Sequence, residues 1–156
     1  MNRFAAVPLI AVVFVLALSA CGGGDDAPSK AEFAERAEEI CQNAERQLDN
    51  IGEDATTPAE VADAVDEVIE QSRESLDELR ELEQPDGDAG EAAQRFVDAL
   101  GSDIEDKGIP ALEDLRDALQ DNDQQAAQQA AQKLQEIETS NTDELAKEVG
   151  ATDCGE

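Results

Sequence analysis

The sequence predicts an all-α fold, an antiparallel four-helix bundle, from three observations. Apolar residues recur every three or four positions through residues 29–150, which is the period of an amphipathic helix. No stretch shows the strict polar and apolar alternation that is typical of a half-buried strand. Ser29 and Thr57 are each followed three positions later by a glutamate, a pattern that marks helix starts. Since the connections between helical segments are short, successive helices should run antiparallel.

The first two helices have clear boundaries in the sequence. The first follows Ser29 and carries Phe33 and Ile40 on its apolar face, and Gly52 ends it because glycine readily adopts the conformation of a helix C-cap. The second follows Thr57, with a proline at its first helical position, where the missing N–H has no cost. This helix should stop before residues 84–88, whose proline, glycine and aspartates favour a turn.

The second half of the chain predicts two more helices with an interruption in each. Residues 89–120 form the third helix, in which we expect a break or a sharp kink near residues 108–110, where a glycine loosens the chain and a proline removes a backbone donor. Residues 121–123 are the next turn, and the alanine-rich and glutamine-rich fourth helix follows. Residues 140–142 favour a break in that helix, which allows a short fifth helix before Gly150.

The N-terminus carries an export signal in residues 1–20. Arg3 supplies a short positive segment, an apolar run extends from Phe4 to Leu18, and small residues follow. An uncleaved membrane helix is the weaker alternative, because the run is shorter than the ~20 residues that span a bilayer and Pro8 interrupts it.

The sequence Leu18-Ser19-Ala20-Cys21 resembles the bacterial lipobox. This resemblance implies that Cys21 receives a diacylglyceryl thioether, that a peptidase cleaves before it, and that an acyl chain such as palmitate is added to the new N-terminus. An ordinary secretory signal that contains a cysteine is the alternative. Residues 21–28 then form the lipidated cysteine and a flexible tether of at most about 25 Å, and residues 29–156 form the helical domain. The predicted location is the extracytoplasmic face of the cell membrane.

The charge of the chain restricts its partners. The net charge is −28 at pH 7, and it becomes −29 when residues 1–20 are removed, because they contain Arg3 and no acid. Such a charge excludes nucleic acid and the surface of anionic lipids, which both require patches of lysine and arginine. Most acids are expected to cover solvated helix faces, and the charge also suits cationic partners.

The cysteine count predicts one disulfide. With Cys21 lipidated, Cys41 and Cys154 remain as a pair in an exported, oxidising compartment. A catalytic or metal-binding dithiol is the alternative, although the chain has no Cys-x-x-Cys motif and no histidine.

Three short motifs mark the start, the first helix and the end of the domain. They are residues 29–33 (Ser-Lys-Ala-Glu-Phe), residues 39–41 (Glu-Ile-Cys), and Val149-Gly150 followed by residues 153–155 (Asp-Cys-Gly). Together they resemble the small helical envelope lipoproteins of actinobacteria. Members commonly end in an aromatic-Gly-Leu-x-x-Cys-Gly motif, in which this chain replaces the aromatic residue by Val149 and the leucine by Ala151. The resemblance implies a helical, disulfide-linked lipoprotein and carries no particular activity.

Catalytic groups are missing from the sequence. It contains no histidine, tyrosine or tryptophan, so a nucleophile such as Ser72 would have no imidazole base. Ser72 is better explained as a small residue on a helix face. Neighbouring carboxylates are so frequent that no pair is distinguished as an acid and base couple. The sequence therefore predicts a protein that is not an enzyme.

Calcium is the one metal for which the sequence offers candidate ligands. The turns that contain Asp86 and Asp88, and Asp121 and Asp123, are rich in oxygen ligands, but neither has the spacing of an EF-hand. Turn and helix-capping roles explain the same four residues. We expect no bound metal, and no cofactor other than the covalent lipid on Cys21.

These observations predict a non-catalytic structural or interaction module, anchored in the lipid bilayer through Cys21. Its partner would be another component of the cell envelope. The alternative is a lipoprotein that binds calcium or a small ligand.

Overall fold

The structure, a computed structural model, describes residues 27–137 and 140–155. None of these residues lies in a β-strand, which confirms the predicted all-α fold. No helix among them is both long enough and apolar enough to cross a membrane. In chain order the elements are α1 (Lys30–Leu48), α2 (Pro58–Glu81), α3 (Asp88–Ser102), the π-helical segment η1 (Asp103–Gly108), α4 (Ile109–Gln120), α5 (Gln124–Gln135), α6 (Ser140–Val149) and the 3-10 helix η2 (Thr152–Gly155).

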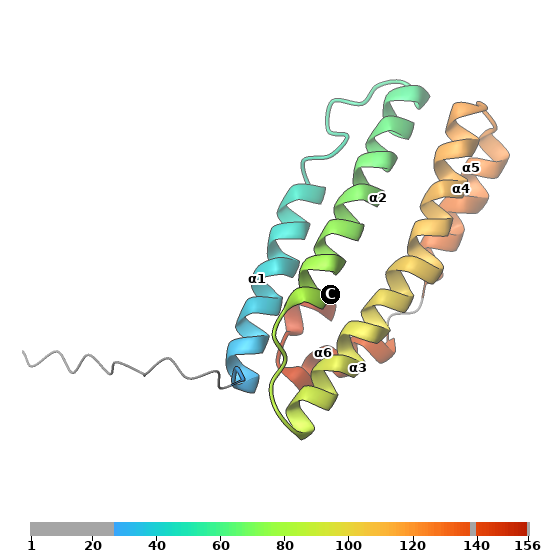
Figure 1. The fold of residues 1–156 in the computed structure, drawn as a ribbon. Coiled ribbons are helices and arrows are strands. Elements are labelled where there is room, and N and C mark those ends of the chain that lie inside the picture. Colours follow the sequence, from blue (N-terminus) through green and yellow to red (C-terminus); the bar gives the residue numbers. More distant parts are fainter. Residues whose placement is uncertain (1–26, 138–139, 156) are drawn as a thin grey trace, which may run out of the picture.

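The helices lie side by side in an open arrangement (Figure 1). α1 and α2 form an antiparallel hairpin, and α3, η1 and α4 form one long rod beside α2. α5 folds back along α4, on the side away from α1, whereas α6 packs against α3 at the other end of the molecule. η2 then contacts α1. Two short helices with different neighbours take the place of the predicted fourth helix, so the structure does not confirm a regular four-helix bundle.

Both predicted capping boxes are present. At the start of α1, the Ser29 N–H donates to the Glu32 carboxylate over 2.8 Å and the Glu32 N–H donates to the Ser29 hydroxyl over 3.3 Å. At the start of α2, the Thr57 N–H donates to the Glu60 carboxylate over 2.9 Å, and the Glu60 N–H donates to the Thr57 hydroxyl over 3.3 Å. Glu60 also accepts the N–H of Thr56 over 2.9 Å. These bonds satisfy N–H groups that have no partner inside the helix.

The structure interrupts the α-helix near residues 108–110, as predicted, but by a π-helical segment between α3 and α4 and not by a break in the rod. The rod continues through η1, where the Ile109 N–H donates to the carbonyl of Ile104, five residues back. In a regular α-helix the ring of Pro110 would meet the carbonyl four residues back, and the wider π-helical turn shifts that register by one residue. Gly108 helps this turn close, because a Cβ there would lie 3.3 Å from the Asp103 carbonyl oxygen.

The fourth helix ends earlier than predicted. α5 stops at Gln135, and Ser140 begins α6, so residues 140–142 start a helix and do not break one. This position suits them, because serine, asparagine and threonine favour helix N-termini. Thr142 is 2% exposed, and its hydroxyl donates to the Asp103 carboxylate over 2.5 Å. α6 is therefore the short fifth helix that the sequence allowed, and Asp103 ties its first turn to η1.

The core is divided into two clusters. The larger one joins α1, α2, α3 and α6 around two phenylalanines, and the smaller one lies between α2, η1 and α4. Alanines fill many of the buried positions, which lets helices approach closely. The larger cluster includes Phe33, Ala37, Leu79, Ala93, Phe96, Val97, Ala146, Val149 and Ala151. The smaller one is built on Val65, Ile69 and Ile109.

The Cys41–Cys154 disulfide closes the fold and confirms the predicted pairing. It joins the middle of α1 to η2, with the two Cα atoms 5.3 Å apart. The same contact includes a hydrogen bond from the Thr152 N–H to the Glu38 carboxylate over 3.1 Å. The first helix and the C-terminal turn of the domain are thus held together covalently.

Removal of the disulfide should destabilise the full chain. The bond joins residues 113 positions apart, and closing a loop of that length lowers the entropy of the unfolded chain by an amount equivalent to ~4–5 kcal/mol at most. We expect the double variant Cys41→Ser, Cys154→Ser to lose about 2–5 kcal/mol of unfolding free energy in urea denaturation. Dithiothreitol should lower the stability of the natural chain and leave the double variant unchanged. Equal urea midpoints for the two proteins would contradict the role given to the bond.

The capping box of α2 should make stability depend on pH. Hydrogen bonds from the Thr56 and Thr57 backbone and hydroxyl groups lower the pKa of Glu60 from 4.5 to about 2. Since the pKa is lower in the folded state, this contribution is complete above pH 4.5 and is lost as the pH falls towards 2. Glu60→Gln should therefore flatten the dependence of unfolding free energy on pH in that interval. The control Glu53→Gln, in the preceding loop, should leave the slope unchanged.

Candidate functional site

A groove of about 520 Å³ runs between α1 and α2 and is bounded on a third side by the end of α3 and the start of η1. We call it the α1–α2 groove. The Cys41–Cys154 disulfide and its neighbour Asp153 close one end of it. Its large apolar wall residues are Ile40, Leu48, Leu76, Leu79, Leu100 and Ile104.

The groove exists because neither α5 nor α6 covers this part of the hairpin. α5 packs on α4, and α6 packs on α3. As a result Ile40, Leu48, Leu100 and Ile104 are only half-buried, although each is a large apolar side chain. Half-buried apolar residues around one hollow give it the character of a binding surface.

Small residues also line the groove, between its larger apolar side chains, and leave space there. Ala44 lies on α1, and Ser72 and Ser75 lie on α2. The Ser72 hydroxyl donates to the Val68 carbonyl over 2.8 Å, and the Gln71 amide donates to the Ser75 hydroxyl over 3.2 Å. Both serines are thus satisfied within α2. The groove therefore has a mostly apolar lining with few unpaired hydrogen-bonding groups. Ser72 is a small residue on a helix face, as the sequence predicted.

The rim of the groove is acidic. Glu45 and Asp49 lie on the α1 side, and Asp153 lies at the closed end, where it accepts a hydrogen bond from the Gln42 amide over 2.5 Å. Among the described residues that line the groove there is no lysine or arginine. An apolar centre with negative charge at its edge favours an apolar ligand that carries positive groups.

The η1 wall of the groove is held in place by Arg80. Its guanidinium donates to both carboxylate oxygens of Glu105, over 2.9 and 2.6 Å, and these bonds lower the pKa of Glu105. Buried Gly101 provides the space, since a Cβ there would lie 3.0 Å from an Arg80 nitrogen. Two more ion pairs join α2 to α4, between Arg73 and Glu113 and between Arg116 and Asp66. These contacts position the wall formed by Ile104 beside α2.

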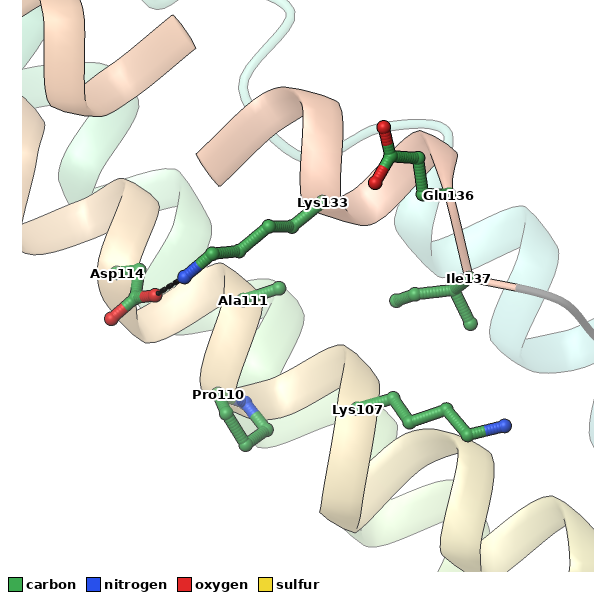
Figure 2. A pocket seen from close by; sticks show the side chains of 7 residues that line it. All are labelled: Lys107, Pro110, Ala111, Asp114, Lys133, Glu136 and Ile137. Atoms are coloured by element: carbon green, nitrogen blue, oxygen red, sulfur yellow. Dashed lines mark hydrogen bonds and ion pairs between the residues drawn. The ribbon is translucent and has the colours of Figure 1, made fainter. Parts of the chain in front are cut away.

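A second hollow, of about 430 Å³, lies where the end of α5 packs beside the start of α4 (Figure 2). Lys133 of α5 reaches across it to Asp114 of α4 over 2.6 Å. Lys107 on the opposite side pairs with Asp103 over 2.5 Å. Because each lysine already holds a carboxylate, the hollow is better explained as part of the contact between α5 and α4. The α1–α2 groove is the stronger candidate site.

The four acids considered for calcium lie apart in the structure. Asp86 and Asp88 precede and begin α3, whereas Asp121 and Asp123 follow α4, at the opposite end of the same rod. Asp123 caps α5 by accepting the N–H groups of Gln125 and Ala126, each over 3.0 Å. Within the described ranges no group of three or more histidine, cysteine, aspartate or glutamate residues is placed to hold a metal ion.

Of the other predicted site residues, Cys41 and Cys154 meet, and Cys21 lies outside the described residues. The groove itself was not predicted. The sequence predicts Ile40 and Ser72 on the faces of two helices, but it does not show that these faces border one hollow. Glu45 and Asp49 looked like any other solvated acids. Only the position of α5 beside α4 shows that this face is open.

No protein-family model, no curated protein and no solved structure matches this chain. The groove, its acidic rim and the disulfide that closes it are therefore the basis on which a function can be proposed.

Proposed function

We propose that the protein is a non-catalytic lipoprotein of the bacterial cell envelope that binds a partner in the α1–α2 groove. The observation that carries this proposal is the groove itself, an apolar hollow of about 520 Å³ between helices that ion pairs and a disulfide hold in place. A fixed frame favours binding, because little conformational entropy is lost when the partner arrives.

The chemistry of the groove favours binding over catalysis. Its lining consists of aliphatic side chains, two serines whose hydrogen bonds stay within α2, and carboxylates at the rim. General acid–base catalysis usually needs a group poised near neutral pH, and the chain has no histidine to supply one.

The proposed anchor depends on the N-terminal sequence. The lipobox-like Leu18-Ser19-Ala20-Cys21 supports lipidation at Cys21, and the tether to α1 is short. Two or three acyl chains would hold the protein on the membrane durably, at ~0.8 kcal/mol for each buried methylene. The Cys41–Cys154 bond supports an extracytoplasmic location, because disulfides persist in oxidising compartments.

A small apolar ligand is the second candidate for the groove. Its volume of about 520 Å³ falls within the ~300–1,000 Å³ typical of small-molecule sites. The half-open side of the groove and its charged rim favour a larger, cationic partner over this candidate.

Lipidation can be tested by intact mass spectrometry of the protein from native envelope. The mature chain should begin at Cys21 and carry the mass of a diacylglyceryl group, with or without a further acyl chain. Cys21→Ser should remove that mass and release the protein from the membrane fraction. An unmodified soluble chain would refute the anchor and leave the groove to be tested separately.

Binding through the groove can be tested by photocrosslinking in the cell. A benzophenone amino acid in place of Leu48, which lies on the groove wall, should crosslink to one specific envelope partner. The control is the same amino acid in place of Val61, an aliphatic residue 36% exposed on α2 outside the groove. Identical crosslinked products at both positions would contradict the proposal.

A further inference from the structure

We propose that the groove receives a cationic amphipathic α-helix of its partner. This inference deepens the proposed function and depends on it, because it names the class of partner that the same site would bind. Three observations carry it: the shape of the groove, the way α6 packs beside it, and the charge of its rim.

The shape of the groove matches a helix. Its walls are helical on all three long sides, namely α1, α2 and the end of α3 with η1. Along α1 the groove extends from Ile40 to Leu48, which is about 12 Å or two helical turns at 1.5 Å per residue. Small lining residues, including Ala44 and Ser72, leave space between the larger apolar side chains. Helices pack in this way, because a row of side chains on one helix fits between the rows of side chains on the other.

The protein's own α6 shows what fits between these three helices. Val149 and Ala146 of α6 belong to one buried cluster with Phe33 of α1, Leu79 of α2 and Phe96 of α3. Ile40, Leu100 and the disulfide pack against that cluster and also line the groove. The groove therefore adjoins the apolar surface on which the amphipathic helix α6 packs.

The negative charge at the rim indicates that the partner is positively charged. Glu45, Asp49 and Asp153 border the apolar surface, and the chain as a whole carries −28. Lysine or arginine residues beside the apolar stripe of a helix would face these carboxylates. A lipid acyl chain would fill apolar space without using the acids, and an anionic headgroup would be repelled by them. The combination favours a basic amphipathic helix, which is a common occupant of helix-lined grooves.

The proposal can be tested with a defined peptide. The probe is a peptide of about 18 residues, with leucine at every third or fourth position on one face and lysine elsewhere. The full lipidated chain is placed in zwitterionic phosphatidylcholine nanodiscs, and empty nanodiscs give the reference signal. We expect saturable binding that weakens as salt is raised, since salt screens charges near a surface. Hydrogen exchange should show protection along residues 40–48 of α1.

Two charge reversals on α1 provide a matched pair. Glu45→Lys reverses a charge at the groove rim, and Glu39→Lys makes the same change on the same helix outside the groove. Both residues are exposed, and both variants change the net charge equally. Glu45→Lys should weaken peptide binding about tenfold, and Glu39→Lys should leave it within about twofold. Circular dichroism checks that both variants keep their helical content.

The other outcomes overturn the proposal in distinguishable ways. If a scrambled peptide with the same composition binds equally, or if both variants weaken binding equally, only the net charge attracts the peptide. A different result is that the peptide fails to bind while N-phenyl-1-naphthylamine, a neutral apolar dye, binds to the natural protein and not to the Leu48→Asp variant. The groove then takes a small ligand. In that case the helix proposal is refuted and the proposed binding function survives. If neither probe binds and Leu48 gives no specific crosslink in the cell, both proposals fail.

Discussion

The attachment of the C-terminal turn to α1 is the contact on which the rest of the structure depends. α1 packs mainly on α2 and would otherwise have few neighbours on its inner side. The Cys41–Cys154 bond and the hydrogen bond from Thr152 to Glu38 supply them, and Val149 is buried in the same region. This contact holds α6 against α3, completes the larger core cluster and forms the closed end of the groove. A domain with so many alanines in its core has little other apolar surface with which to do this.

The π-helical segment η1 controls which face of the hairpin stays open. Because it accommodates Pro110 within a continuous rod, α4 keeps the direction of α3 and carries α5 to the side of the molecule away from α1. A break at this point would allow α4 and α5 to turn back over the hairpin and cover the groove. The bond between Thr142 and Asp103 then fixes α6 to η1. Burial raises the pKa of Asp103, but the hydrogen bonds from Lys107 and Thr142 and the charge of Lys107 together outweigh it, so the pKa is lowered and the carboxylate stays ionised.

The sequence predicted the parts of the fold that local chemistry decides. Both capping boxes, the helical class and the disulfide follow from residue type and spacing, and the structure contains them. The long-range arrangement was less predictable. Gly108 and Pro110 usually interrupt a helix, and no local signal distinguishes a break from a π-helical turn. The apolar stripe of α5 also fits either α4 or the hairpin, so its neighbour depends on the direction of the rod. The groove could not be predicted because it results from both choices.

The disulfide also determines when the groove becomes complete. In the cytosol thiols are kept reduced, so a newly made chain would carry Cys41 and Cys154 as free thiols. The closed end of the groove depends on their bond. A chain exported as proposed would therefore acquire its complete site only after translocation, when oxidation joins the two ends of the domain. The same covalent bond that stabilises the fold would therefore make completion of the groove depend on an oxidising compartment.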